Sequence, residues 1–178
     1  MKPLVVALGL SAIASIAMAQ PPYAGMQTRP VKALSDKDVA DLKAGRGMGL
    51  ALPAELNGFP GPAHVLENAD ALGLTVDQRQ RTKALFEAMK AEAVPVGERL
   101  IQQETELDGL FAQRQITPAN LRTATERIGV TQGRLREAHL KYHLAMMTIL
   151  TPAQIEKYQT LRGYRSDASE QPHQHRHN

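Results

Sequence analysis

The sequence contains no cysteine and no tryptophan, and only 4% of its 178 residues are aromatic. Without cysteine, the chain can have no disulfide framework, no thiol redox chemistry and no cysteine-ligated metal. The scarcity of aromatic side chains argues against a carbohydrate-stacking or drug-binding pocket. Stability must therefore come from packing of aliphatic side chains, and any bound metal would need histidine, methionine or carboxylate ligands.

An excess of one charge is also missing, because 21 lysine and arginine residues face 18 aspartate and glutamate residues. The two signs are intermixed, whereas nucleic-acid-binding proteins usually cluster their basic residues. The sequence has no nucleophile elbow, P-loop, His-Glu-x-x-His or dinucleotide fingerprint. The glycine-rich segment 45–49 lacks the preceding strand and the ending of a phosphate-binding loop. We therefore expect a flexible loop there, no enzymatic activity and no nucleic-acid partner.

The N-terminal segment has the pattern of a cleavable export signal. Lys2 precedes an apolar run over residues 4–17, and Ala17-Met18-Ala19 matches a small-residue cleavage site. The run is shorter than the roughly 20 apolar residues of a membrane-spanning helix, and no later run is more apolar. We expect residues 1–19 to be a signal peptide, which leaves an exported, soluble chain of 159 residues with a net charge of +2.

The rest of the chain has the apolar periodicity of helices, with no sustained alternation typical of strands. The fold class is therefore predicted to be all-α. A long antiparallel helical hairpin is expected from two long helices separated by about four residues. The predicted helices cover residues 36–44, 62–72, 76–113, 118–149 and 152–161.

This pattern divides the chain into four parts. Residues 1–19 are the signal peptide, and residues 20–61 form an N-terminal extension with one short helix and a loop rich in glycine and proline. A single helical turn could form around residues 53–56 within this loop. Residues 62–165 form the all-helical domain, and residues 166–178 form a disordered, histidine-rich tail.

Four helix starts share one local pattern, in which a Ser or Thr precedes a polar residue by three positions. The hydroxyl can accept a bond from an early helical N–H, and the polar side chain can reach back to the N–H of the cap residue. Each such cap contributes about 1 kcal/mol. The four cap residues are Ser35, Thr75, Thr117 and Thr151.

Two of these starts, Leu74-Thr75-Val76-Asp77-Gln78 and Leu150-Thr151-Pro152-Ala153-Gln154, also share the pattern LTxxQ. Together with the export signal and the all-helical pattern, they resemble the Spy/CpxP family of periplasmic proteins over residues 66–164. That family includes ATP-independent chaperones, a stress-signalling inhibitor and metal-binding relatives of the ZraP and CnrX type. The resemblance implies a cradle-like, dimeric fold.

His139 and His143 are the strongest candidates for metal ligands within the helices. Their i, i+4 spacing places both imidazoles on one helical face, with Met147 four residues further on. Imidazole suits Zn, Cu and Ni, and a thioether favours softer ions such as Cu(I). His64 and Glu67 would complete the site if their helix folds back. The alternative is that His139 is an ordinary hydrogen-bonded interface residue and that the methionines fill the core.

The C-terminal tail carries a second histidine cluster, which consists of His173, His175 and His177. Short histidine-rich tracts on a flexible tail can chelate Cu, Ni or Zn weakly. The alternatives are a solvated tail or one that gains charge at acidic pH.

Basic residues interleaved with leucine and methionine recur along the two long helices. Such a surface could hold unfolded proteins, although a solvated face with i, i+4 ion pairs explains the same pattern. Taken with the resemblance, we expect a periplasmic envelope-stress protein with chaperone-like, ATP-independent binding of unfolded proteins. The alternative is a sensor or scavenger of Zn, Cu or Ni, with no other cofactor required. The expected partners are unfolded proteins or the periplasmic domain of a sensor kinase, together with a second copy of the chain.

Overall fold

The computed structural model describes residues 23–165, and every regular element in that range is helical. The prediction of an all-α fold is therefore confirmed. The elements are η1 (Met26–Thr28), α1 (Asp36–Lys43), α2 (Leu52–Glu55), α3 (Pro62–Glu67), α4 (Val76–Ala112), α5 (Pro118–Met146) and α6 (Pro152–Leu161). The proposed signal peptide and the histidine tail lie outside the described residues.

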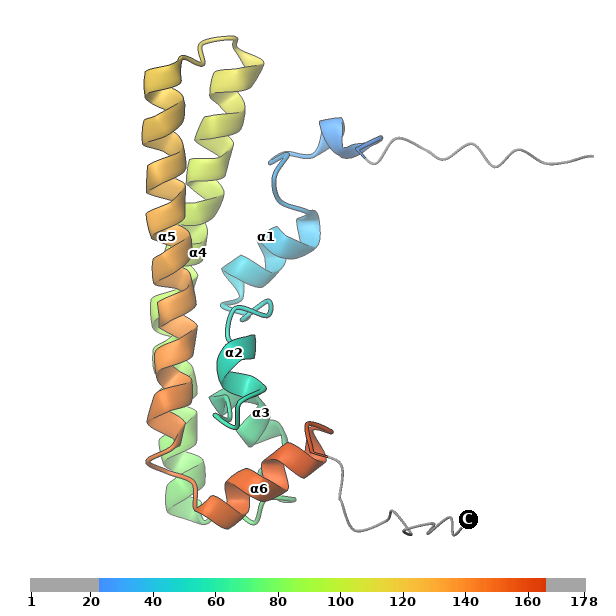
Figure 1. The fold of residues 1–178 in the computed structure, drawn as a ribbon, viewed down its shortest axis with the longest axis vertical. Helices are drawn as coiled ribbons and strands as arrows, with labels where there is room; N and C mark the ends of the chain where they lie inside the picture. The colour runs from blue at the N-terminus through green and yellow to red at the C-terminus, as the bar shows by residue number, and fades with distance from the viewer. Residues whose placement is uncertain (1–22, 166–178) are drawn as a thin grey trace, which may run out of the picture.

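The two long helices, α4 and α5, lie side by side and run in opposite directions (Figure 1). Ala93 and Leu100 of α4 pack in one apolar cluster with Ile128, Leu135 and Ala138 of α5. Ion pairs flank this cluster, and Lys141 Nζ lies 2.6 Å from a carboxylate oxygen of Glu92. The helix pair is the frame on which the shorter elements are placed.

The N-terminal segment runs along one side of the helix pair, and α1 packs against α4 (Figure 1). Leu42 of α1 joins the apolar cluster between α4 and α5. Gly97 makes this approach possible, because a Cβ atom there would lie 2.8 Å from the backbone oxygen of Leu42. Lys32 adds an ion pair with Asp108 at 2.9 Å. The N-terminal segment is therefore packed onto the helix pair.

A second apolar cluster lies at the end of the helix pair where α3 and α6 meet it. Val65 of α3, Met146 of α5 and Tyr158 of α6 are all fully buried there. This cluster attaches α6 to the rest of the fold. Beside it, α3 contacts both α4 and α5, and α2 contacts α5.

All four predicted capping boxes are present, at Ser35, Thr75, Thr117 and Thr151. The two LTxxQ motifs also contact each other, which their cap pattern did not predict. Gln78 Nε2 lies 2.8 Å from Gln154 Oε1, and Gln154 Nε2 lies 3.0 Å from Gln78 Oε1. Gln78 also donates to the backbone oxygen of Ile149 at 2.8 Å. The repeated glutamine thus joins the starts of α4 and α6.

Several predicted boundaries differ from the observed ones. The helix expected over residues 62–72 ends at Glu67, because the side chain of Asn68 donates to the backbone oxygen of His64 and turns follow. The helix expected to reach residue 149 ends at Met146. Before residue 62, the described chain contains η1 and the four-residue α2 in addition to α1. Both α2 and α3 have a proline in their first turn, where the missing N–H would have no partner within the helix.

None of the helices within residues 23–165 combines the length and the apolar character that crossing a bilayer requires.

Candidate metal-binding cavity

A cavity of about 670 Å³ lies where the N-terminal segment meets α4, α5 and the residues that follow α6. It is lined by both candidate histidines of α5, His139 and His143. The i, i+4 spacing of these residues on a regular helix places both rings on the same side of α5. The spacing predicted that the two imidazoles share one face of α5. In the structure both residues are also buried.

His139 is the more deeply buried of the two, with 2% of the residue exposed. Its Nε2 atom has no hydrogen-bond partner among the described residues. Burial lowers the pKa of His139 below its usual value, and the nearby His143 lowers it further. The ring is therefore neutral at pH 7, and a neutral ring is the form that binds a metal ion. Gly47 of the glycine-rich loop covers the other side, where a Cβ atom would lie 3.6 Å from Nδ1.

His143 is held by a backbone contact from the N-terminal segment. Its Nδ1 atom lies 2.7 Å from the carbonyl oxygen of Phe59. A carbonyl only accepts hydrogen bonds, so Nδ1 carries the proton and the neutral ring keeps its lone pair on Nε2. A Cβ atom on Gly61 would lie 2.9 Å from Nε2, so only glycine leaves this side of the ring clear. A histidine that donates through one nitrogen and keeps the other free is typical of metal ligands.

Glu55 is a buried carboxylate in this cavity that sequence analysis did not identify. Its Oε1 atom accepts hydrogen bonds from the hydroxyls of Tyr158 and Tyr164 and lies 3.5 Å from Nε of Arg162. Its Oε2 atom lies 3.7 Å from Nδ1 of His143 and has no hydrogen-bond partner among the described residues. Burial, together with the Glu55 carboxylate, raises the pKa of Tyr158, so this phenol stays protonated and donates.

Of the other predicted ligands, two line the cavity and one does not. His64 and Glu67 of α3 line the same cavity and bond to each other, with 2.9 Å between His64 Nδ1 and Glu67 Oε2. Met147 caps the C-terminal end of α5, is 37% exposed and does not line the cavity. His173, His175 and His177 lie outside the described residues.

The cavity also contains groups that are already paired. Lys37 and Arg46 both bond the carboxylate of Asp41 and hold its pKa below the usual range. Asp41 is therefore less available to a metal ion. Met48 and Met89 line the cavity together with the histidines. Within residues 23–165, no three histidine or carboxylate side chains converge as a ready-made metal cluster.

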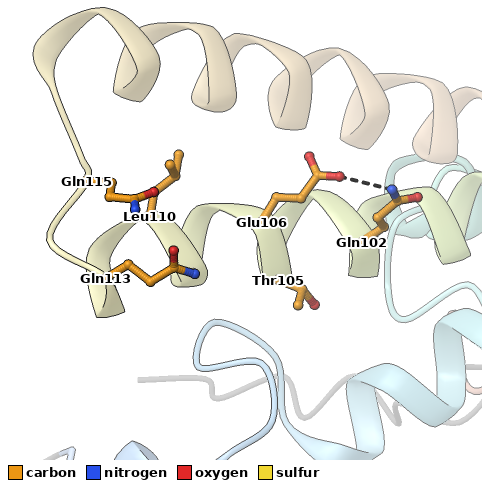
Figure 2. Close-up of a pocket in the computed structure, with 7 residues that line it drawn as sticks. Gln102, Thr105, Glu106, Leu110, Gln113 and Gln115 are labelled. Atoms are coloured by element: carbon orange, nitrogen blue, oxygen red, sulfur yellow. Dashed lines mark hydrogen bonds between the residues drawn. The ribbon is translucent and has the colours of Figure 1, made fainter.

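A second hollow, of about 720 Å³, lies at the opposite end of the helix pair. Figure 2 shows its lining along the end of α4 and the loop that follows, with Gln102 bonded to Glu106 at 2.9 Å. The other lining side chains are mainly small, amide or aliphatic: Thr105, Leu110, Gln113 and Gln115. None of the predicted site residues lies there.

The fold and the cavity define an all-helical protein with a buried, histidine-lined site. Protein-family models, curated proteins and solved structures were each compared with the chain, and none of them matches it. Membership of the Spy/CpxP family therefore stays a prediction from the repeated LTxxQ pattern.

Proposed function

We propose that this chain is a periplasmic metal-binding protein of the Spy/CpxP type that senses or scavenges Zn, Cu or Ni. The observation that carries this proposal is the pairing of His139 and His143 in one cavity, where the buried Nε2 of His139 has no hydrogen-bond partner. A buried polar atom without a partner costs about 1–3 kcal/mol. A metal ion would satisfy it.

The donor set fits such an ion. The two imidazoles supply half of a tetrahedral set, and water or the thioethers of Met48 and Met89 can supply the remainder. The LTxxQ resemblance supports the same function, because metal-binding relatives belong to that family. We further propose that the chain acts as a dimer in the envelope stress response. If it senses metal ions, its partner is the periplasmic domain of a sensor kinase.

The first test is titration calorimetry of the full chain with Zn²⁺, Cu²⁺ and Ni²⁺. The tail histidines are replaced in every sample (His173→Ala, His175→Ala, His177→Ala), so that only the cavity is measured. We expect one bound ion, and we expect His139→Ala with His143→Ala to weaken its binding by at least about 100-fold, because two ligands are lost.

The matched control for this titration is His64→Ala, which removes an imidazole from the edge of the same cavity and leaves both α5 ligands in place. His143→Gln serves as the second variant, since its amide can still donate to Phe59 while it lacks the imidazole. Equal affinity in the parent and in a folded His143→Gln protein would rule out His143 as a ligand.

A second candidate function, chaperone-like binding of unfolded proteins, is favoured by the end of the helix pair that projects beyond α1 (Figure 1). Phe111 lies in the last turn of α4 in this region, and Val130 lies nearer the middle of α5; they are 52% and 56% exposed. Arg127 lies one helical turn before Val130 in the sequence and is half-exposed, with an ion pair to Glu106 at 3.4 Å. Exposed apolar side chains among charges suit weak, ATP-independent capture of clients.

This second function predicts that the chain suppresses aggregation of a thermally unfolded client in buffer without ATP. Replacing both exposed residues (Phe111→Ser with Val130→Ser) should weaken suppression about tenfold, because roughly 1–3 kcal/mol of apolar contact is lost. The control is Val76→Ser, which removes an 85% exposed valine at the other end of α4. Equal loss in both variants would contradict a client site at Phe111 and Val130.

A further inference from the structure

The carboxylate of Glu55 contacts both His143 and the C-terminal part of the chain. One oxygen, Oε2, lies 3.7 Å from Nδ1 of His143. The other, Oε1, accepts from Tyr158 in α6 and from Tyr164 just after it. Arg162, which caps α6, places its Nε atom 3.5 Å from the same oxygen. We propose that Glu55 links metal occupancy at His143 to the attachment of α6, so that α6 reports whether the cavity is filled.

This inference rests on the proposed metal-binding function and adds the residue that transmits it. A cation bound at Nε2 of His143 withdraws electron density from the ring. The Nδ1–H group then becomes a stronger donor to Phe59 and a more positive neighbour for Glu55. Outer partners of this kind orient the ligand and change metal affinity by about 10–100-fold when they are removed.

The charge of Glu55 explains why α6 would respond. A buried carboxylate is costly unless it is compensated, and its one cationic neighbour in the described structure is Arg162 at 3.5 Å. A metal ion on the far side of His143 adds a second positive charge. This charge favours the arrangement in which Glu55 stays buried between His143 and the tyrosines. Because Tyr158 and Tyr164 belong to the α6 region, the same charge favours attachment of α6.

The contacts of Glu55 and His143 join parts of the chain that are far apart in the sequence. Glu55 precedes Tyr158 by 103 residues and Tyr164 by 109. Phe59 precedes His143 by 84 residues. Detachment of α6 would remove the partners of Oε1, and detachment of the N-terminal segment would remove both contacts to Nδ1 of His143. Filling the cavity therefore opposes both motions.

The experiment measures hydrogen–deuterium exchange of the α6 amides in the full chain, with and without saturating Zn²⁺, Cu²⁺ or Ni²⁺. Every sample carries the alanine-substituted tail, since the tail follows α6 in the sequence and metal bound to it could itself slow exchange of the α6 amides. In the parent protein, metal at 100 times its dissociation constant should slow α6 exchange by up to about 100-fold. In Glu55→Gln, metal should still bind, about 10–100-fold more weakly, and α6 exchange should no longer respond.

The matched control is Glu67→Gln, which neutralises a carboxylate bonded to a histidine in the same cavity. It should keep the metal-dependent protection of α6. If Glu55→Gln is unfolded by circular dichroism, Tyr164→Phe replaces it and should reduce the protection at least threefold, because one bond between Glu55 and the α6 region is lost.

Two results would overturn the link while leaving the metal site intact. One is metal binding by the parent with unchanged α6 exchange. The other is full metal-dependent protection in a folded Glu55→Gln protein. Absence of metal binding in the parent would instead refute the proposed function, and the inference with it.

Discussion

Met146→Ala is expected to lower the free energy of unfolding by about 2–5 kcal/mol, the usual cost of truncating a buried large side chain. Met146 is fully buried in the cluster that includes Val65 and Tyr158. Truncation removes apolar contacts and leaves a cavity where α3, α5 and α6 meet. The loss should appear as a lower urea midpoint in unfolding followed by circular dichroism.

The neighbouring residue provides the control. Met147 is 37% exposed and lies at the C-terminal cap of α5. Met147→Ala should change stability by about 0.5 kcal/mol or less, as surface substitutions do. It should also leave metal affinity unchanged, because Met147 does not line the cavity. A loss of affinity in Met147→Ala would instead identify Met147 as a metal ligand, as its spacing from His143 predicts.

Gly97→Ala should destabilise the protein even though alanine favours helices. The added Cβ atom would lie 2.8 Å from the backbone oxygen of Leu42 and 3.2 Å from its Cβ. Backbone cannot rotate away as a flexible side chain can, so α1 must shift. Overpacking of this kind costs about 1–3 kcal/mol. The measurements are the urea midpoint and the rate of proteolytic cleavage around residues 43–46.

The control for Gly97 is Gly133→Ala in α5, where a Cβ atom would meet nothing within 4 Å. There the higher helix propensity of alanine should stabilise the protein by about 1 kcal/mol. Both variants share this propensity gain, so the difference between them measures the contact between α1 and α4. If Gly97→Ala were as stabilising as Gly133→Ala, α1 would not be packed against α4 in solution.

The helices and their starts were largely predictable, because the signals that set them are local. A Ser or Thr followed three residues later by a polar side chain determines a cap within a single turn. The bond between Gln78 and Gln154 was not predictable, because it joins residues 76 positions apart. In each motif the same glutamine side chain closes the cap and reaches the other motif, and only the first role leaves a local pattern.

The candidate site was predictable in part for the same reason. The pairing of His139 and His143 follows from helical spacing, whereas their burial depends on segments that contain Gly47, Phe59 and Gly61. Glu55 was missed because it ends α2, a four-residue helix that is too short to show periodicity. The only sequence signal was one carboxylate among apolar, glycine and proline residues, and such a residue is usually exposed.

The contact between the two LTxxQ motifs also affects the order of folding. The long helices can pair early, because the loop between them is short and closing a short loop costs little entropy. The bond between Gln78 and Gln154, and those of Glu55 with Tyr158 and Tyr164, close loops of 76 to 109 residues. We therefore expect the histidine cavity to be assembled after the helix pair. If the proposed metal ion binds there, we expect it to prolong the survival of the folded chain under proteolysis.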